Sequence, residues 1–166
     1  LGIRNHTSVN TVASVGTPSD YTTYSSAVEK IVTANYTGEI SALAWIGHPR
    51  DMAKLDILED STGQPLNPTP WTAALRKFST TSLPSTEGGG SNESVAIIGS
   101  FPELVLGLRT SGVVIRVLDA GTALDSAGVT HNAASELKRL VIAYLRADTA
   151  LLRPKFFTVL TGITTT

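Results

Sequence analysis

Two segments near the start of the chain have the hydrophobic periodicity of amphipathic helices. In the first, apolar residues recur at helical spacing after the start signal Thr17-Pro18-Ser19-Asp20, with Ser19 or Asp20 as N-cap and Gly38 at the end. In the second, Pro49 occupies the first helical position, apolar residues follow, and the pattern ends near Asp60 before a Ser61-Thr-Gly-Gln turn. We therefore predict two short helices, one that reaches about Tyr36 and is ended by Gly38, and one that begins at Pro49.

Short apolar or β-branched runs predict strands elsewhere in the chain. They lie at residues 41–46, 95–98, 104–108, 113–118 and 156–160, with a short strand plus loop at residues 3–15. Residues 79–94, which contain Gly88-Gly89-Gly90, and residues 121–132 are expected to be loops. Because helices and strands are mixed without strict alternation, the pattern predicts an α+β fold.

Residues 137–152 fit two structures. Leu137, Leu140, Val141, Tyr144 and Leu145 have helical spacing, but short apolar runs are equally compatible with a strand. Periodicity alone leaves both alternatives open.

The amino-acid composition excludes several classes of function but adds little about the fold. The 166 residues carry a formal net charge of -1, only 16% are charged, and there is no cysteine. Disulfides and thiol chemistry are therefore excluded, and a main role in gripping nucleic-acid backbone is disfavoured. No apolar run is long enough to span a bilayer. A surface rich in Ser and Thr with little charge favours extensive contacts with other protein chains, and a first residue Leu1 suggests a partial chain.

No constellation of residues predicts an active site. His6, His48 and His131 have no partner at metal-ligand spacing, and His48 is best explained as a cap at the start of the second helix. Ser100 follows Gly99 but lacks the second glycine of a hydrolase elbow. We therefore predict no enzyme activity, no catalytic, cofactor-binding or metal-binding residues, and no cofactor, while a dispersed Ser/His/Asp triad stays open as an alternative.

Charged residues and glycines have simpler structural explanations. Asp51, Asp56, Glu59 and Asp60, near Arg50 and Lys54, are interpreted as a solvated helix face. The Gly88-Gly89-Gly90 run lacks the lysine and helix of a phosphate loop, and we interpret it as a flexible tip. Basic residues toward the end of the chain are expected to form polar rows on long strands and to pair with acids of neighbouring subunits: Lys138, Arg139, Arg146, Arg153 and Lys155.

Several segments, in order, resemble the C-terminal half of tailed-bacteriophage major capsid proteins of the HK97 fold. The similarity is strongest at residues 44–66, where an apolar strand, a helix and a Gly turn follow one another, with His48 in place of the usual Asn and Glu59 in place of the usual Lys. The remaining motifs are Gly2-Ile-Arg-Asn5 with Ser8-Val-Asn-Thr-Val12, Ile97-Ile-Gly-Ser-Phe101, Leu106-Gly-Leu-Arg109 with residues 113–117, Arg146-Ala-Asp148, and Arg153-Pro-Lys-Phe-Phe-Thr-Val-Leu160. Together they cover nearly the whole chain.

The resemblance implies an HK97-like fold, with a mixed sheet, a few short helices and long closing strands. It implies that residues 1–16 belong to the peripheral (P) domain, residues 17–132 form the axial (A) domain, and residues 133–166 are closing strands of the P domain. It favours a long strand over a helix at residues 137–152. The family's N-terminal arm, extended loop and spine helix have no counterpart, so the chain is expected to be a fragment of a longer subunit. Leu137 and Tyr144 stand where some members form a covalent cross-link, so no such bond is expected.

The resemblance also implies a structural function. The subunit would self-assemble into pentameric and hexameric capsomers and an icosahedral phage or prophage head that encloses double-stranded DNA without sequence-specific binding. Further partners would be scaffold, portal and decoration proteins, with no membrane; the location would be the virion capsid, assembled in the cytoplasm of the bacterial host. The isolated fragment is expected to be monomeric or weakly associated. The alternatives are an encapsulin-like nanocompartment shell and a small hydrolase with a dispersed triad that uses His6, His48 or His131.

Overall fold

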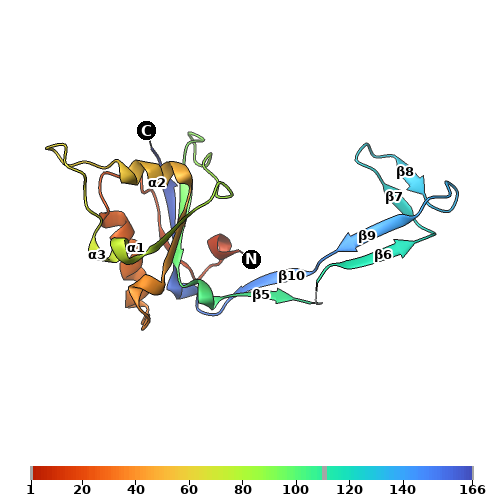
Figure 1. Ribbon diagram of the computed structural model, residues 1–166, viewed down its shortest axis with the longest axis horizontal. Coiled ribbons are helices and arrows are strands. Elements are labelled where there is room, and N and C mark those ends of the chain that lie inside the picture. The colour runs from red at the N-terminus through yellow and green to blue at the C-terminus, as the bar shows by residue number, and fades with distance from the viewer. Residues whose placement is uncertain (1, 110–111, 166) are drawn as a thin grey trace. The chain divides into compact units, whose positions relative to one another are not determined.

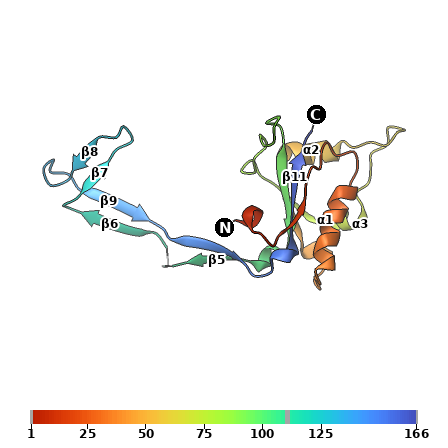
Figure 2. The same cartoon turned by 180° about the vertical axis from the view of Figure 1, so that it is seen from behind.

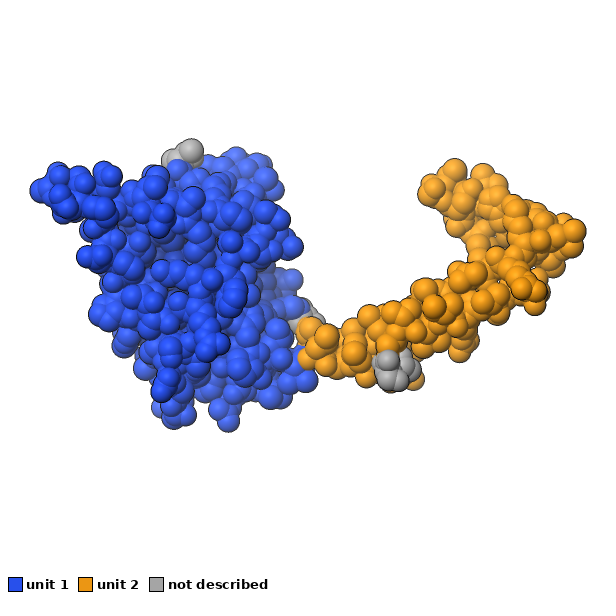
Figure 3. Space-filling model, viewed as in Figure 1, with its two compact units in different colours: residues 1–105, 150–166 blue, residues 106–149 orange. Residues whose placement is uncertain are grey.

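The chain folds into two units, and the second interrupts the first. The computed structural model describes residues 2–109 and 112–165. Unit 1 comprises Leu1–Val105 and Ala150–Thr166, and unit 2 comprises Leu106–Thr149 (Figures 1 and 3). These units divide the chain at positions other than the predicted domain boundaries, so the assignment of residues to axial and peripheral domains stays a prediction.

Unit 1 is built on a five-stranded mixed sheet with the order β1-β11-β4-β2-β3. The strands are β1 (Asn10–Val12), β2 (Ala44–Gly47), β3 (Arg76–Ser79), β4 (Ser94–Gly99) and β11 (Phe157–Ile163). β11 runs parallel to β1 and antiparallel to β4, and β2 runs antiparallel to β4 and parallel to β3. The last strand of the chain therefore lies in the interior of the sheet, beside the first strand (Figure 1).

The core of unit 1 lies between this sheet and its helices, α1 (Thr22–Thr33), α2 (Pro49–Asp56) and α3 (Pro70–Ala74). Tyr24 of α1 stacks on Trp45 of β2 with ring centroids 4.5 Å apart, and both side chains are buried. The Thr158 hydroxyl of β11 donates a hydrogen bond to the Ala27 carbonyl of α1 at 2.9 Å. This contact satisfies a buried polar group and fixes α1 against the sheet (Figure 2).

The start of the second helix agrees with its sequence pattern, whereas the cap of the first helix and both helix ends do not. His48 Nδ1 accepts a hydrogen bond from the Arg50 amide at 3.2 Å, so the predicted cap of the second helix is confirmed. α1 begins at Thr22 with Tyr21 as its N-cap, so the predicted N-cap at Ser19 or Asp20 is wrong, although Asp20 Oδ1 accepts a hydrogen bond from the Thr22 amide at 2.8 Å. The predicted end of the first helix at Gly38 is wrong. α1 ends at Thr33, because Asn35 takes a left-handed backbone conformation with φ of 63°.

The second helix also ends earlier than predicted, and one carboxylate that was predicted to be exposed is buried. α2 ends at Asp56 rather than near Asp60, whose carboxylate instead accepts hydrogen bonds from Thr62 and Gln64 in the turn that follows. Asp56, Glu59 and Asp60 are exposed as predicted, but Asp51 is only 2% exposed. Asp51 faces β4 and accepts a hydrogen bond from the Ser94 hydroxyl, so its assignment to a solvated face is wrong.

Arg50 fixes the glycine-containing segment that precedes β4. Its guanidinium donates to the Asn92 carbonyl at 2.9 Å and to the Ser85 carbonyl at 3.3 Å. Glu87 and Glu93 exchange backbone hydrogen bonds of 2.9 and 3.0 Å, which close a turn around the three glycines. The predicted tip at Gly88-Gly89-Gly90 is therefore the end of a short hairpin.

Outside the five-stranded sheet, the strands pair two by two. β5 (Leu104–Leu108) pairs with β10 (Ala147–Leu151), β6 (Val114–Leu118) with β9 (Leu140–Tyr144), and β7 (Thr122–Leu124) with β8 (Thr130–Asn132). The strand interpretation of residues 137–152 is thus confirmed, although two strands replace one. Residues 121–132, predicted as a loop, contain the β7–β8 hairpin.

Charged side chains surround His131 in the β7–β8 region. His131 Nδ1 lies 3.1 Å from Glu136 Oε2, and its Nε2 lies 3.2 Å from Asp125 Oδ2. Hydrogen bonds from Lys138 and His131 lower the pKa of Glu136 to about 2. The amide of Val129 and, less strongly, the ring of His131 lower the pKa of Asp125. Both carboxylates are therefore ionised at a lower pH than usual, within hydrogen-bond distance of His131.

Removing the donor to the buried carboxylate should destabilise unit 1. We expect Ser94→Ala to lower the free energy of unfolding by about 1–3 kcal/mol, because Asp51 stays buried after losing the Ser94 hydroxyl. Urea denaturation measures this change. Ser82→Ala, at an exposed serine, is the matched control and should change stability by less than about 0.5 kcal/mol. Equal effects of the two substitutions would contradict the role of Ser94.

Acid should loosen the β7–β8 hairpin at a lower pH than ordinary glutamates would require. Because the folded-state pKa of Glu136 is depressed from 4.5 to about 2, its stabilisation is complete above the ordinary value and is lost as the pH falls toward about 2. Amide NMR signals of Thr122–Leu124 and Thr130–Asn132 should report this transition. Glu136→Gln should remove the part of the pH dependence that Glu136 contributes and leave that of Asp125, and an unchanged titration in this variant would contradict the assignment.

Candidate assembly surface

Large apolar side chains that are exposed to solvent gather in unit 2 rather than in unit 1. Unit 2 contributes Leu106, Leu108, Val113, Ile115, Val117, Leu118, Leu124, Val129, Leu137, Val141, Ile142 and Leu145. Ala133 is the one buried apolar residue among the described part of this unit. Unit 2 therefore has strands but almost no core of its own.

Strands β6 and β9, which we call the ribbon, place these side chains on two faces. Ile115 stands opposite Ala143 and Val117 opposite Val141, and residues directly opposite in an antiparallel pair share a face. Ile115, Val117 and Val141 are 65%, 57% and 62% exposed. These four residues form what we call the apolar face of the ribbon, which carries no polar side chain.

The opposite face combines apolar side chains with arginine and tyrosine. Val114, Arg116 and Leu118 of β6 stand opposite Tyr144, Ile142 and Leu140 of β9. The guanidinium carbons of Arg116 and Arg146 lie 5.7 and 5.9 Å from the centroid of the Tyr144 ring, within the range of cation–π attraction. We call this the arginine–tyrosine face.

A two-stranded ribbon with apolar side chains on both faces cannot bury them by itself. Such a pair is at best marginally stable alone in water, and its edges leave backbone groups available for pairing. Covering one large apolar side chain contributes about 1.5–3 kcal/mol. The ribbon is thus a surface that another polypeptide segment would stabilise by covering it.

One sequence signal could have identified this surface. Residues 113–118 and 140–145 are nearly continuous apolar runs without the polar-apolar alternation of a strand that has one solvated face. Such runs are typical of strands buried on both sides. These runs predict strands, and their lack of alternation also indicates that both faces would be covered.

The structure does not bring the three histidines together. His48 caps α2, the Nδ1 of His6 accepts a hydrogen bond from the Ser8 amide at 3.4 Å, and His131 lies in the other unit. Ser100 is buried, and its amide donates to the Phe156 carbonyl at 3.1 Å. Within residues 2–109 and 112–165, no group of three or more His, Cys, Asp or Glu side chains could hold a metal ion. These residues therefore show no assembled catalytic geometry.

Most of the basic residues expected to pair with neighbouring subunits already have partners. Arg139 pairs with Asp119 at 3.0 Å, Lys138 with Glu136 at 2.5 Å, and Arg153 with Glu103 at 3.7 Å. Acids of the same chain therefore pair with these three residues, and pairing with acids of neighbouring subunits stays a prediction. Arg146, by contrast, contacts Tyr144 and forms no ion pair among the described residues.

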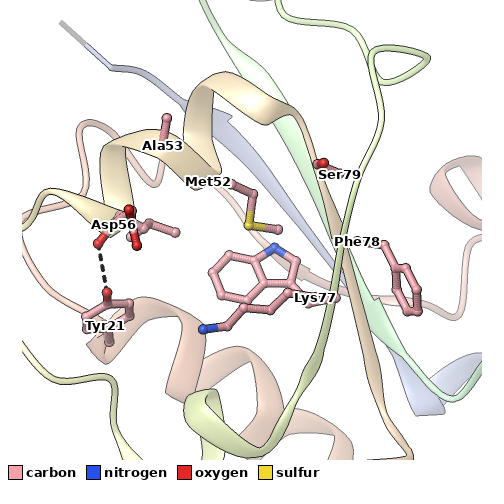
Figure 4. A pocket seen from close by; sticks show the side chains of 9 residues that line it. Tyr21, Met52, Ala53, Asp56, Lys77, Phe78 and Ser79 are labelled. Atoms are coloured by element: carbon pink, nitrogen blue, oxygen red, sulfur yellow. Dashed lines mark hydrogen bonds between the residues drawn. The ribbon is translucent and has the colours of Figure 1, made fainter.

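Unit 1 contains a cavity of about 390 Å³, lined by Tyr21, Trp45, Met52, Ala53, Leu55, Asp56, Lys77, Phe78 and Ser79. Figure 4 shows that the Phe78 ring points away from it. The Tyr21 hydroxyl donates to the Leu55 carbonyl at 2.7 Å, and burial, followed by the charge of Asp56, raises its pKa. Lys77 lies 5.8 Å from the centre of the Trp45 ring. No hydrogen bond joins two titratable side chains among the described residues of this lining.

No helix in the described part of the chain has the length and apolar character needed to cross a membrane. No protein-family model matches the chain. No curated protein matches its sequence.

Solved capsid structures, in contrast, match the fold over nearly the whole chain. A chain of Gordonia phage Cozz matches with a TM-score of 0.59 at 17% identity, covering 96% of this chain and 51% of that chain. Mycobacterium phage Adephagia gives 0.58 at 13% identity, covering 93% and 50%. The capsid of an empty GTA particle gives 0.52 at 14% identity, covering 94% and 50%.

These likenesses confirm the predicted fold class, a mixed sheet with few short helices. At such low identities they establish the fold and no more, and the chain spans about half the length of the capsid chains that it matches. The chain has the HK97-type fold of phage capsid structures, as its sequence motifs predict.

Proposed function

We propose that this chain is part of a major capsid protein that assembles into pentameric and hexameric capsomers and an icosahedral phage or prophage head. The observation that carries the proposal is the exposed apolar face of the ribbon, Ile115, Val117, Val141 and Ala143, in a chain with a capsid fold. Its role is structural rather than enzymatic, because self-assembly requires complementary surfaces and no reacting groups.

Assembly through the ribbon follows from the way apolar surface is stabilised. A neighbouring copy that covers the ribbon with a different part of its own surface makes a heterologous contact, and such contacts close into rings when the rotation between copies closes. Because every subunit repeats the contact, each one can be weak while the closed shell is stable. Large apolar side chains without a core inside unit 2 support this arrangement.

The remaining parts of the proposal rest on charge and on the fold. A formal net charge of -1 suits a wall that encloses double-stranded DNA without gripping its backbone. Scaffold, portal and decoration proteins would be further partners, with the virion capsid as the location and the host cytoplasm as the place of assembly. In the subunit, residues 1–16 and 133–166 would belong to the P domain and residues 17–132 to the A domain.

An encapsulin-like shell is the alternative with the same fold. Chains of phages Cozz and Adephagia and of the GTA capsid match with TM-scores of 0.52 to 0.59, which favours the phage capsid over this alternative. No arrangement of His6, His48 or His131 in the described residues favours the hydrolase.

A charge placed on the apolar face should prevent assembly without unfolding the subunit. We expect Ile115→Asp in the full-length protein to raise the concentration needed for capsomers at least about tenfold, because a carboxylate would have to lose its water in the interface. Sedimentation velocity and negative-stain microscopy measure this.

Phe78→Asp is the matched control, since Phe78 is 56% and Ile115 65% exposed, but Phe78 lies on strand β3 of unit 1. The control variant should assemble like the unmodified protein. Normal shells from Ile115→Asp would contradict the proposed role of the ribbon.

The chain of 166 residues by itself should be monomeric or weakly associated. One contact between two copies lacks the multiplication that a closed shell supplies. Sedimentation velocity over a range of concentrations should therefore show a single species near 17.4 kDa that associates only at high concentration. A tight dimer or other small closed oligomer would contradict this expectation.

A further inference from the structure

Two guanidinium groups on the arginine–tyrosine face have no acidic partner. Arg116 and Arg146 each lie within reach of the Tyr144 ring, but neither forms an ion pair among the residues that the structure describes. Arg139, which is also exposed in unit 2, does pair, with Asp119 at 3.0 Å. The ribbon thus presents two unpaired positive charges beside one aromatic ring.

The acids of unit 2 are already engaged elsewhere. Asp119 pairs with Arg139, Asp125 with His131, and Glu136 with Lys138 and His131, while Asp148 Oδ1 accepts a hydrogen bond from the Thr149 amide. Unit 2 carries five basic and four acidic residues. Its excess positive charge is therefore left on residues that include Arg116 and Arg146.

Unit 1 has the opposite excess, with eight basic and ten acidic residues. Glu29, Asp56 and Glu59 of unit 1 are exposed and form no ion pair among the described residues. A second copy of the chain can therefore supply carboxylates that the ribbon lacks. This is the charge complementarity that a contact between two different surfaces of identical subunits requires.

The surroundings of the two arginines favour protein over nucleic acid. Leu118 and Ile142 lie on the same face, 37% and 38% exposed, so a partner that covers the arginines also buries apolar surface. A planar guanidinium held on an aromatic ring is well placed to bind a carboxylate through two parallel hydrogen bonds. Arginine and tyrosine surrounded by side chains that exclude water are typical of the residues that dominate protein interfaces. A backbone-binding surface for DNA would instead present several cations without apolar neighbours.

We infer that Arg116 and Arg146 bind carboxylates of a second copy of this polypeptide and thereby set the orientation in which neighbouring subunits meet. The inference rests on the proposed capsid function and adds to it a charged recognition element on the face opposite the apolar face. The apolar face supplies the area that is covered, and the arginine pair selects which surface covers it. Neighbouring subunits that met in another orientation would leave the guanidinium groups without an acceptor.

The test compares assembly of the full-length protein with that of Arg116→Gln/Arg146→Gln as the salt concentration rises. The double variant should need about tenfold more protein, or more, to form capsomers, since two charge-assisted contacts are lost. Its assembly should also depend less steeply on sodium chloride than that of the unmodified protein. Arg139→Gln, which removes another exposed charge from the same unit, should assemble normally.

The conservative variant Arg116→Lys/Arg146→Lys keeps both charges and should fall between the unmodified protein and the glutamine variant. Circular dichroism of each variant verifies folding, and the salt dependence of the unmodified protein tests the inference even if a variant unfolds. Assembly of the unmodified protein that is insensitive to salt, or normal assembly of the glutamine variant, would overturn the inference.

Normal assembly of the glutamine variant with reduced binding of double-stranded DNA would overturn it as well, and would assign the arginines to nucleic acid. In each of these outcomes the unmodified protein still assembles, so the proposed function stands. If the unmodified full-length protein forms no capsomers at all, the proposed function fails and the inference fails with it.

Discussion

The ladder between β4 and β11 is the contact on which the rest of the chain depends. A Cβ atom at Gly99 would lie 2.3 Å from the Phe157 ring, so the two strands meet too closely for any side chain at that position. Where the ladder ends, the Ser100 amide binds the Phe156 carbonyl, and the Leu152 amide binds the Glu103 carbonyl. These two hydrogen bonds hold the ends of the long connection between β4 and β11 together. Because the entropy cost of closing a loop rises only slowly with its length, so long a connection between neighbouring strands is tolerated.

Unit 2, which lies between β4 and β11 in the sequence, has almost no core of its own. Its strands pair only two by two, so each pair has two faces and no second layer to cover either one. In unit 1 the same kinds of apolar side chains are buried between the sheet and α1, whereas Ile115, Val117 and Val141 are left in solvent. The fold thus separates a unit with a buried core from one whose apolar side chains are mostly exposed.

Elements with a local physical signal could be predicted from the sequence. His48 and Pro49 indicate the start of α2, and the short apolar run at residues 95–98 indicates a strand, which the structure contains. Two features that depend on distant residues were not predicted. Asp51 is buried against Ser94, which lies 43 positions away. Residues 137–152 have helical spacing but form strands, because they pair with β5 and β6. The unpaired arginines could not be predicted, because whether an arginine has an acid beside it depends on the fold.

Burial of the ribbon on assembly is the central claim, and the absence of cysteine makes it directly measurable. A single Val117→Cys substitution places one thiol on the apolar face, where the native side chain is 57% exposed. The rate of its reaction with a maleimide can be compared between unassembled full-length subunits and purified shells. We expect rapid labelling of the subunits and strong protection in the shells. Equal labelling rates in the two states would contradict it.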